Sequence, residues 1–365
     1  MILLCLKSCK LLYITSTDTM ISRKGYENSS ATMVRENSVL IALAGQGKTR
    51  GTVAINRIPL STNQSIAAMT FSDDIDSDYV FSNLENRYEE LRSISSGDGS
   101  RGGLNKKLVG DVTIPCPTLL EQNAIGTLFR VLNELITLHQ RKLEQQKNLK
   151  KYFLQNMFPA KGEKVPRIRF KGFTGDWEQR KLGELVIIER GGSPRPIDAY
   201  ITEAQDGLNW VKIGDAPEQG RYITHTKEKI KPSGLSKTRQ VFPGDLILSN
   251  SMSFGKPYIM GITGCIHDGW LLIRNNQNVF DLKFLCQMLG TKQMLVQYRR
   301  LAAGSTVNNL NKELVANAIV KVPETTEQEQ IGAFLENLDN VITLHQRKLN
   351  QLLTMKKFML QNLFI

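Results

Sequence analysis

Apolar residues recur at three- and four-residue steps through two long stretches of the chain, residues 125–158 and 331–364. Neither stretch contains a proline, or a glycine after its second residue. This a/d pattern is typical of coiled-coil helices, and at about 1.5 Å per residue each helix would be a rod of roughly 50 Å. The apolar seam consists of Ile125, Leu132, Ile136, Leu143, Phe153 and Met157 in the first stretch and Ile331, Leu338, Ile342, Leu349, Leu352, Met359 and Leu363 in the second.

The two stretches are copies of one another at an offset of 206 residues. Of 34 aligned positions 18 are identical, including an unbroken ITLHQRKL. An apolar stripe backed by polar residues needs a partner, and the other copy is the expected one. Two separate helices packed on two separate domains are the alternative. Each copy follows a proline and a Glu-Gln pair, namely Pro117 with Glu121-Gln122 and Pro323 with Glu327-Gln328.

The repeat extends to the globular parts that precede each helix. Tyr13–Thr17 resembles Tyr222–Thr226, and 104–108 resembles 310–314. Short β-rich runs separated by turn residues, together with two further helical patterns, predict an α+β fold. We expect strands at Ser38–Leu43, Leu185–Ile188, Leu246–Ser249 and Ala318–Val322, and helices at Asp78–Ile94 and Asp281–Tyr298.

The two globular parts differ in length. Shifting Pro166–Pro196 by the offset of the repeat places its counterpart before residue 1. We therefore expect the first globular part to lack its opening strands. An incomplete sheet would expose apolar surface and unpaired strand edges.

The chain has 365 residues, enough for two domains of ordinary size with connectors. It carries 47 Lys and Arg against 35 Asp and Glu, a net charge of +12, which favours nucleic acid or an acidic membrane surface as partner. No apolar run reaches membrane-spanning length. The five cysteines lack C-x-x-C spacing, which argues against disulfides or a zinc site and favours the cytoplasm.

The nearest approach to a catalytic motif is Ala42–Thr49, which is similar to a phosphate-binding loop with alanine in place of its first glycine. Such a loop needs a helix directly after it, whereas Arg50–Ile55 has the pattern of a strand. We favour a glycine turn whose amides, with Lys48 and Arg50, face a phosphate backbone or a base edge. No methyltransferase or nuclease signature is visible, so we predict no catalytic residue.

Histidines occupy equivalent seam positions, His139 and His345, on the two predicted helices. A hydrogen bond in the core or between subunits is favoured over a metal-binding or proton-transfer role. We predict no metal site.

Turn-rich basic and polar segments recur at equivalent places in both globular parts. Arg and Lys bind phosphates, while Asn, Ser, Thr and Arg can read base edges. Any one segment could be an ordinary solvated loop, but their recurrence favours one shared face. The candidate DNA contacts are Lys48, Thr49, Arg50 and Arg101 in the first part and Arg195, Lys212, Ser251, Ser253, Lys256, Ser305, Thr306, Asn308 and Asn309 in the second.

With these motifs the chain resembles the specificity subunit of a type I restriction-modification enzyme. Both copies carry the entry P-x-x-x-E-Q…I-G and the tail H-Q-R-K-L…K-K…L-Q-N-x-F. Gly47–Gly51 is similar to the target-recognition loop of that family. The resemblance covers nearly everything from Tyr13 onward, and in the second part it rests on Arg167–Phe173, Trp177–Leu185, Gly191–Pro194 and Val241–Ile247.

The resemblance implies an α+β fold in which two target-recognition domains are joined by two long antiparallel coiled-coil helices in a pseudo-twofold arrangement. The implied domains are residues 1–117 (first recognition domain, N-terminally incomplete), 118–158 (central helix), 159–323 (second recognition domain) and 324–365 (C-terminal helix). It further implies a non-catalytic subunit that reads a bipartite sequence on double-stranded DNA, with the helices as a ruler. We hypothesise that the missing opening impairs the first domain.

The resemblance also implies partners and cofactors. The helices would dock methyltransferase and restriction subunits, with no role for a membrane. This subunit would bind no cofactor, whereas its partners would use S-adenosylmethionine, ATP and magnesium. Two alternatives remain: a coiled-coil adaptor with two basic interaction domains, and an ATP-using enzyme built on Gly45–Thr49. The candidate docking residues are His139, Arg141, Lys142, His345, Arg347 and Lys348.

Overall fold

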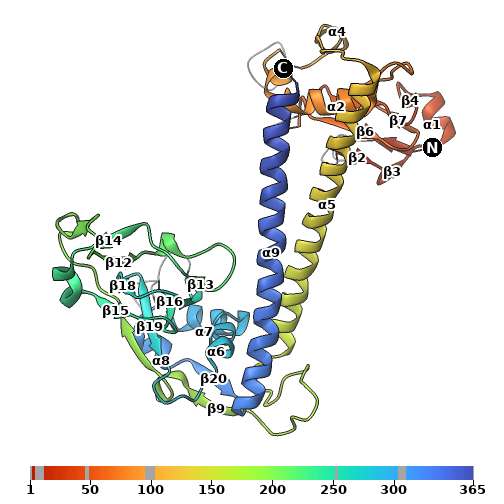
Figure 1. The fold of residues 1–365 in the computed structure, drawn as a ribbon. Coiled ribbons are helices and arrows are strands. Elements are labelled where there is room, and N and C mark those ends of the chain that lie inside the picture. The colour runs from red at the N-terminus through yellow and green to blue at the C-terminus, as the bar shows by residue number, and fades with distance from the viewer. Residues whose placement is uncertain are drawn as a thin grey trace. The chain divides into compact units, whose positions relative to one another are not determined.

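The computed structural model describes residues 2–4, 12–45, 49–94, 103–250, 254–302 and 310–364 (Figure 1). They form two compact units, one of residues 1–140 with 347–365 (unit 1) and one of residues 141–346 (unit 2). Each unit contains one globular domain and part of both long helices, α5 (Leu119–Asn156) and α9 (Thr325–Leu363). Both helices begin six residues ahead of the predicted starts, within the predicted helical domains.

Two four-stranded sheets form the globular domain of unit 1. Their strand orders are β3-β1-β7-β4 and β2-β6-β5-β8. Apolar side chains from both sheets, among them Ile14, Leu40 and Leu60, pack into one buried core. The strands are β1 (Ile2–Leu4), β2 (Tyr13–Ile14), β3 (Thr19–Met20), β4 (Thr32–Val34), β5 (Val39–Ala42), β6 (Val53–Asn56), β7 (Leu60–Thr62) and β8 (Ile66–Met69).

Two five-stranded sheets form the globular domain of unit 2, with a further two-stranded pair. The strand orders are β10-β19-β16-β17-β13, β11-β14-β12-β18-β15 and β20-β9. The first seven strands are β9 (Glu178–Lys181), β10 (Ile187–Arg190), β11 (Ile201–Thr202), β12 (Leu208–Val211), β13 (Tyr222–Ile223), β14 (Glu228–Ile230) and β15 (Arg239–Val241). The others are β16 (Leu246–Ser249), β17 (Pro257–Met260), β18 (Gly264–Ile266), β19 (Trp270–Arg274) and β20 (Ile319–Val322).

The sheets of the two units repeat one another strand by strand. Strands β1 to β8 correspond in order to β12 to β19, and the pairings agree in partner and direction. For example, β1 pairs parallel with β7 as β12 does with β18. Among the described residues, β9, β10, β11 and β20 have no counterpart in unit 1. As a result β8 is an edge strand, whereas β19 is covered by β10.

Helices flank the sheets, and two predicted helices are each split. The predicted helix Asp78–Ile94 is confirmed as α2 and α3, which meet at Arg87, and Asp281–Tyr298 as α6 and α7, which are separated at Gly290. The helices are α1 (Arg23–Glu27), α2 (Ser77–Asn86), α3 (Tyr88–Ser93), α4 (Lys106–Gly110), α6 (Leu282–Leu289), α7 (Lys292–Ala302) and α8 (Lys312–Ala316). Short 3-10 helices lie at Leu182–Glu184, Ile197–Ala199, Ile213–Asp215 and Pro232–Lys237.

Most predicted strands are confirmed, but one prediction was wrong in part. The strand expected at Leu185–Ile188 begins only at Ile187. Leu185 and Val186 follow a 3-10 turn and are buried in the core of unit 2, which explains their apolar character without a strand.

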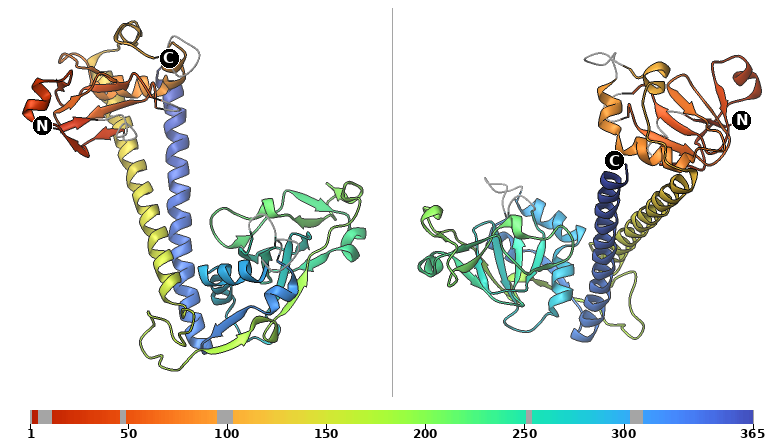
Figure 2. Two further views of the ribbon diagram at one scale, coloured as in Figure 1. Left: turned by 180° about the vertical axis from the view of Figure 1, so that it is seen from behind. Right: turned by 45° about the horizontal axis from the view of Figure 1, so that its top comes forward.

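In unit 2 the two long helices run antiparallel, side by side in each view (Figure 2). Phe153 on α5 meets Phe334 on α9 with ring centroids 4.8 Å apart, while the earlier α5 residue Lys150 pairs with the later α9 residue Asp339. The predicted seam residues are buried or half-buried. Leu363 is the exception, 41% exposed at the last helical position.

Candidate nucleic-acid interface

The predicted DNA contacts divide into residues inside and outside the described structure. Those inside are Thr49 and Arg50 in the first recognition domain and Arg195, Lys212 and Lys256 in the second. Their contacts with DNA stay predictions. Those outside the described residues are Lys48, Arg101, Ser251, Ser253, Ser305, Thr306, Asn308 and Asn309.

In the second recognition domain, hydrogen bonds around Asp268 join described residues that lie in or beside three predicted contact segments. The Ser193 hydroxyl donates to Asp268 Oδ1 at 2.9 Å, which ties the Gly191–Arg195 segment to the start of β19. Asn250 Nδ2, at the end of β16, donates to the Asp268 carbonyl at 2.9 Å. The Leu310 amide, just past the Ser305–Asn309 segment, donates to the Asn250 carbonyl at 3.2 Å. The described residues that adjoin these segments therefore lie in one region, and a shared DNA-binding face stays a prediction.

The described basic residues around this region differ in their exposure and in their hydrogen-bond or ion-pair partners. The side chain of Arg195 is 83% exposed, and its guanidinium lies 3.8 Å from Asp268 Oδ2. Lys256 is exposed at the start of β17, and its backbone amide donates to Ser249 Oγ at 2.9 Å. Lys212 instead pairs with Glu228. Arg195 and Lys256 therefore stay candidate phosphate contacts.

In the first recognition domain, the described residues on either side of 46–48 connect two strands. The Gly51 amide donates to the Ala42 carbonyl at 2.9 Å, so β5 continues directly into the turn that leads to β6. A phosphate-binding loop needs a helix there, and β6 is a strand. The described residues therefore argue against a phosphate-binding loop, and the glycine turn facing a phosphate backbone or a base edge stays a prediction. The Leu104 amide donates to the Leu43 carbonyl at 3.1 Å, which repeats the link between Leu310 and Asn250.

Sequence reasoning missed Asp268 and Asn250, which organise the contact segments without being basic. The available signal was the Asp-Gly pair before a strand, which marks a tight turn. That signal does not reveal a contact with Ser193, because the two residues are 75 positions apart.

The repeated motif P-x-x-x-E-Q…I-G anchors each recognition domain to its helix. In unit 2, Gln328 Oε1 accepts the Asp281 amide at 3.0 Å, and Gln328 Nε2 donates to the Pro323 carbonyl at 3.0 Å. A methyl group at Gly332 would lie 2.5 Å from Asp281 Oδ1 and 2.7 Å from the Phe284 amide. Only glycine therefore lets the capped start of α6 approach α9 this closely.

Unit 1 repeats this anchor residue by residue. Gln122 Oε1 accepts the Asp76 amide at 3.1 Å, and Gln122 Nε2 donates to the Pro117 carbonyl at 2.9 Å. At Gly126 a methyl group would lie 2.2 Å from Asp76 Oδ1. The anchor fixes each domain on the first turns of its helix.

A comparison with known protein families also finds the duplication. Residues 8–148 and 174–354 match the family described as "Type I restriction modification DNA specificity domain". The chain belongs to that family. The resemblance inferred from the sequence is thereby confirmed, and the chain is a DNA-recognition specificity chain.

Similar proteins support the family and the fold. The "Type I restriction enzyme MjaVIII specificity subunit" of Methanocaldococcus jannaschii is 23% identical over 339 residues, which cover 89% of this chain and 77% of the relative. The structure of an S subunit from M. genitalium superposes with a TM-score of 0.68 at 16% identity, covering 91% of this chain and 84% of that one. A structure described under "complex assembly" of the type I R-M system has a TM-score of 0.53 at 17% identity, covering 93% and 85%.

On this specificity chain, the candidate docking residues lie on the long helices. Arg141, Lys142, Arg347 and Lys348 are exposed, and both seam histidines are half-buried. Among the described residues no cluster of His, Cys, Asp or Glu could hold a metal ion, and no helix is long and apolar enough to cross a membrane. Cys116, Cys265 and Cys286 are free thiols.

Exposed apolar residues form two pairs on each long helix, three residues apart within a pair and eleven residues, about three helical turns, from one pair to the next. Their positions on α5 and α9 correspond at the offset of the repeat, and every one is at least 36% exposed. Exposed apolar side chains that gather on one face of a helix are typical of a surface for a partner. This outer stripe consists of Leu135, Leu138, Leu149 and Tyr152 on α5 and Val341, Leu344, Met355 and Phe358 on α9.

Proposed function

We propose that this chain is the specificity subunit of a type I restriction-modification complex and that it reads a bipartite DNA target in the cytoplasm. Each recognition domain reads one half of the sequence, and the long helices fix the distance between the halves. The chain itself performs no catalysis. Methyltransferase subunits supply S-adenosylmethionine-dependent methylation, and restriction subunits supply ATP- and magnesium-dependent cleavage.

The anchor that occurs twice carries this proposal. A reader that must keep a fixed register on DNA needs a rigid connection to its support. The paired Gln and Gly contacts provide such a connection in each unit. Helices of 38 and 39 residues at about 1.5 Å per residue measure about 57 Å, between one and two turns of DNA at roughly 35 Å each.

The outer stripe supports docking of two copies of one partner. Equivalent apolar positions on two copies of a helix form two equivalent surfaces, and two identical subunits can bind to them. Amphipathic helices of a methyltransferase subunit have the chemistry to pack on such rows.

Co-purification with the methyltransferase subunit tests the docking. Leu138→Glu and Leu344→Glu place a charge at equivalent positions that are 45% and 65% exposed. We expect each variant to lose one bound methyltransferase subunit and the double variant to lose both, while circular dichroism stays unchanged. Gln140→Glu, which adds the same charge at an exposed position off the stripe, is the control. A double variant that retains both subunits would disprove this docking surface.

A further inference from the structure

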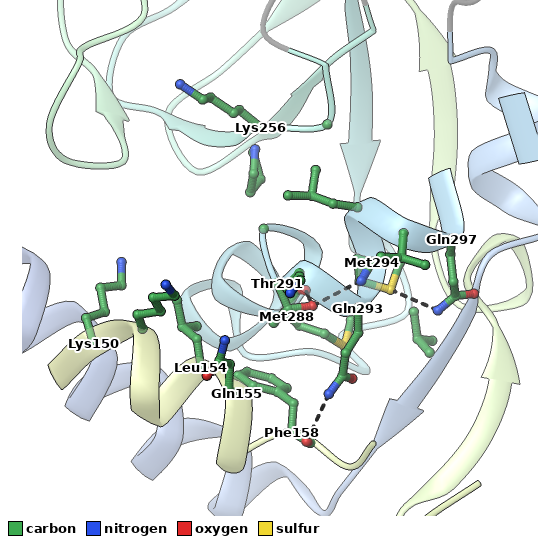
Figure 3. Close-up of a pocket in the computed structure, with 18 of the residues that line it drawn as sticks. Lys150, Leu154, Gln155, Phe158, Lys256, Met288, Thr291, Gln293, Met294 and Gln297 are labelled. Atoms are coloured by element: carbon green, nitrogen blue, oxygen red, sulfur yellow. Dashed lines mark hydrogen bonds between the residues drawn. The ribbon is translucent and has the colours of Figure 1, made fainter. Parts of the chain in front are cut away.

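A large cleft lies within unit 2, beside the second recognition domain. Its volume is about 1090 Å³. Its walls come from the C-terminal end of α5, the segment 159–162 that follows it, α7 and the start of β17. Figure 3 shows Lys150, Leu154 and Gln155 on one side and Met294 and Gln297 on the other.

The residues that line this cleft are strongly basic. Nine are Lys or Arg and two are acidic, an excess of seven positive charges in a chain whose net charge is +12. More than half of the net charge of the protein is thus gathered around one cavity. The basic residues are Lys147, Lys150, Lys151, Lys161, Arg221, Lys256, Lys292, Arg300 and Lys321.

Three of these cations are already engaged. Lys150 and Arg221 both face Asp339. Lys321 Nζ donates to the carbonyls of Ala160 and Glu163. The other six have no ion pair with any described residue. They are Lys147, Lys151, Lys161, Lys256, Lys292 and Arg300.

The floor of the cleft is apolar, and this strengthens the electrostatic potential of these charges. Leu154, Phe158, Met288 and Met294 line it, and the last two are less than 5% exposed. A concave surface with low-dielectric walls and charges of one sign concentrates the potential and attracts counter-ions. Such a site favours a polyanion over a neutral ligand.

We propose that this cleft binds the phosphate backbone of double-stranded DNA, independently of sequence, next to the half-site that the second recognition domain reads. This inference rests on the proposed function and adds a contact that the helices themselves make. Lys147 and Lys151 lie on α5, so the helix that sets the spacing also touches DNA.

Continuity with the predicted contact segments favours DNA over an acidic peptide. Lys256 follows Ser253 by three residues and Arg300 precedes Ser305 by five, so in sequence the cleft adjoins two predicted contact segments that lie outside the described residues. A duplex bound to those segments is therefore expected to reach the cleft. Phosphate contacts position a protein on DNA, while base contacts specify the sequence. The cleft should therefore set affinity and its salt dependence, and leave the recognised sequence unchanged.

The test measures the affinity for DNA as a function of salt concentration. It uses the complex of this chain with its methyltransferase subunits. The variant replaces Lys147, Lys151, Lys292 and Arg300 by alanine. The control, of equal net charge, replaces Lys171, Lys181, Lys227 and Arg299, which are exposed outside the cleft. Each phosphate contact contributes about 0.9 to the slope of log K against log salt. We expect the magnitude of the slope to fall by about 3.6 for the four cations and Kd near 0.1 M salt to rise at least 100-fold in the variant only, with an unchanged methylation motif.

An unchanged slope and affinity in the cleft variant would overturn the proposal, as would equal losses in the control. Loss of methyltransferase binding with DNA affinity retained would assign the cleft to an acidic partner protein instead. Should the fourfold variant fail to fold, Arg300→Glu against Arg299→Glu on the same helix decides the question in the same assay. A wild-type complex without any sequence preference would refute the proposed function, whatever the slope.

Discussion

The two units bury the same lysine but pair it differently. Lys150 and Lys356 are equivalent positions of the repeated helix and are 7% and 8% exposed. In unit 2 the carboxylate that meets Lys150 is Asp339 on the facing long helix. In unit 1 the position equivalent to Asp339 is Asn133, and the carboxylate comes from the recognition domain, Glu85 of α2, at 2.6 Å from Lys356 Nζ. The repeat thus preserves the buried ammonium and changes its partner.

This difference shows how the repeats diverged without losing the fold. A buried charge must be paired, but the pairing partner can come from any element that reaches it. In unit 1, Asn133 on α5 contacts the recognition domain instead, because its Nδ2 donates to the Tyr13 hydroxyl on β2 at 3.2 Å. In unit 1 both contacts tie the recognition domain to a long helix, whereas the Lys150–Asp339 pair of unit 2 joins the two long helices.

A second difference concerns the glutamate of the P-x-x-x-E-Q motif. Glu327 is fully buried, and its two carboxylate oxygens accept from Arg169 Nε and an Arg169 terminal nitrogen at 2.7 and 2.8 Å. This pairing also raises the pKa of Arg169 above its usual value. Glu121, the equivalent in unit 1, is exposed. Arg169 belongs to the segment Pro166–Pro196, which has no counterpart among the described residues of unit 1.

The largest predicted effect tests the difference between the buried Glu327 of unit 2 and the exposed Glu121 of unit 1. Arg169→Ala leaves a fully buried carboxylate unpaired and should lower the free energy of unfolding of unit 2 by about 3 to 5 kcal/mol. Glu121→Ala removes an exposed side chain and should change it by less than about 0.5 kcal/mol. Chemical denaturation of the two variants measures the difference. Equal effects would mean that the motif glutamate has the same role in both units.

The next effect concerns the buried lysine in unit 1. Glu85→Gln removes the partner of Lys356 and should cost about 3 kcal/mol, the lower end for a buried pair because Glu85 is 21% exposed. Adding Asn133→Asp restores a carboxylate where unit 2 has one and should recover part of the loss. A double variant no more stable than Glu85→Gln alone would show that the two sites are not interchangeable.

The smallest effect is a pH dependence that belongs to unit 2. Burial, and then the positive charge of Arg221, lower the pKa of Lys150 from 10.5 to about 8. The unfolded chain therefore binds this proton more tightly, and stability should rise with pH between these values. Relative to Lys150→Met, the wild type should gain about 2 kcal/mol of unfolding free energy from pH 7 to 9.5. A flat or falling difference would contradict the account of Lys150.

The sequence predicts the features that depend on local pattern and repetition. The seam positions and the α+β class follow from apolar periodicity, turn residues and the offset of the two copies, whereas the antiparallel arrangement of the helices comes from the family resemblance. The roles of Gln328 and Gly332 could be recognised as a motif, but their contact with Asp281 could not be derived from it.

Long-range polar partners lie beyond sequence reasoning. Asp339 is 189 residues from Lys150, and Glu85 is 271 residues from Lys356, so only the folded structure brings each pair together. The same holds for Asp268, which forms hydrogen bonds with Ser193, 75 residues away, and with Asn250, 18 residues away. Which side chains touch DNA stays a prediction.

A methylome tests the central claim most directly. The chain is expressed with its methyltransferase subunit in a host that lacks adenine methylation, and modified adenines are mapped by long-read sequencing. Two anchored recognition domains predict a split motif with two different halves and a fixed gap. A palindrome built from a single half would show that the first domain, with its shorter sheets, does not read DNA. That result, or methylation without any motif, would contradict the account.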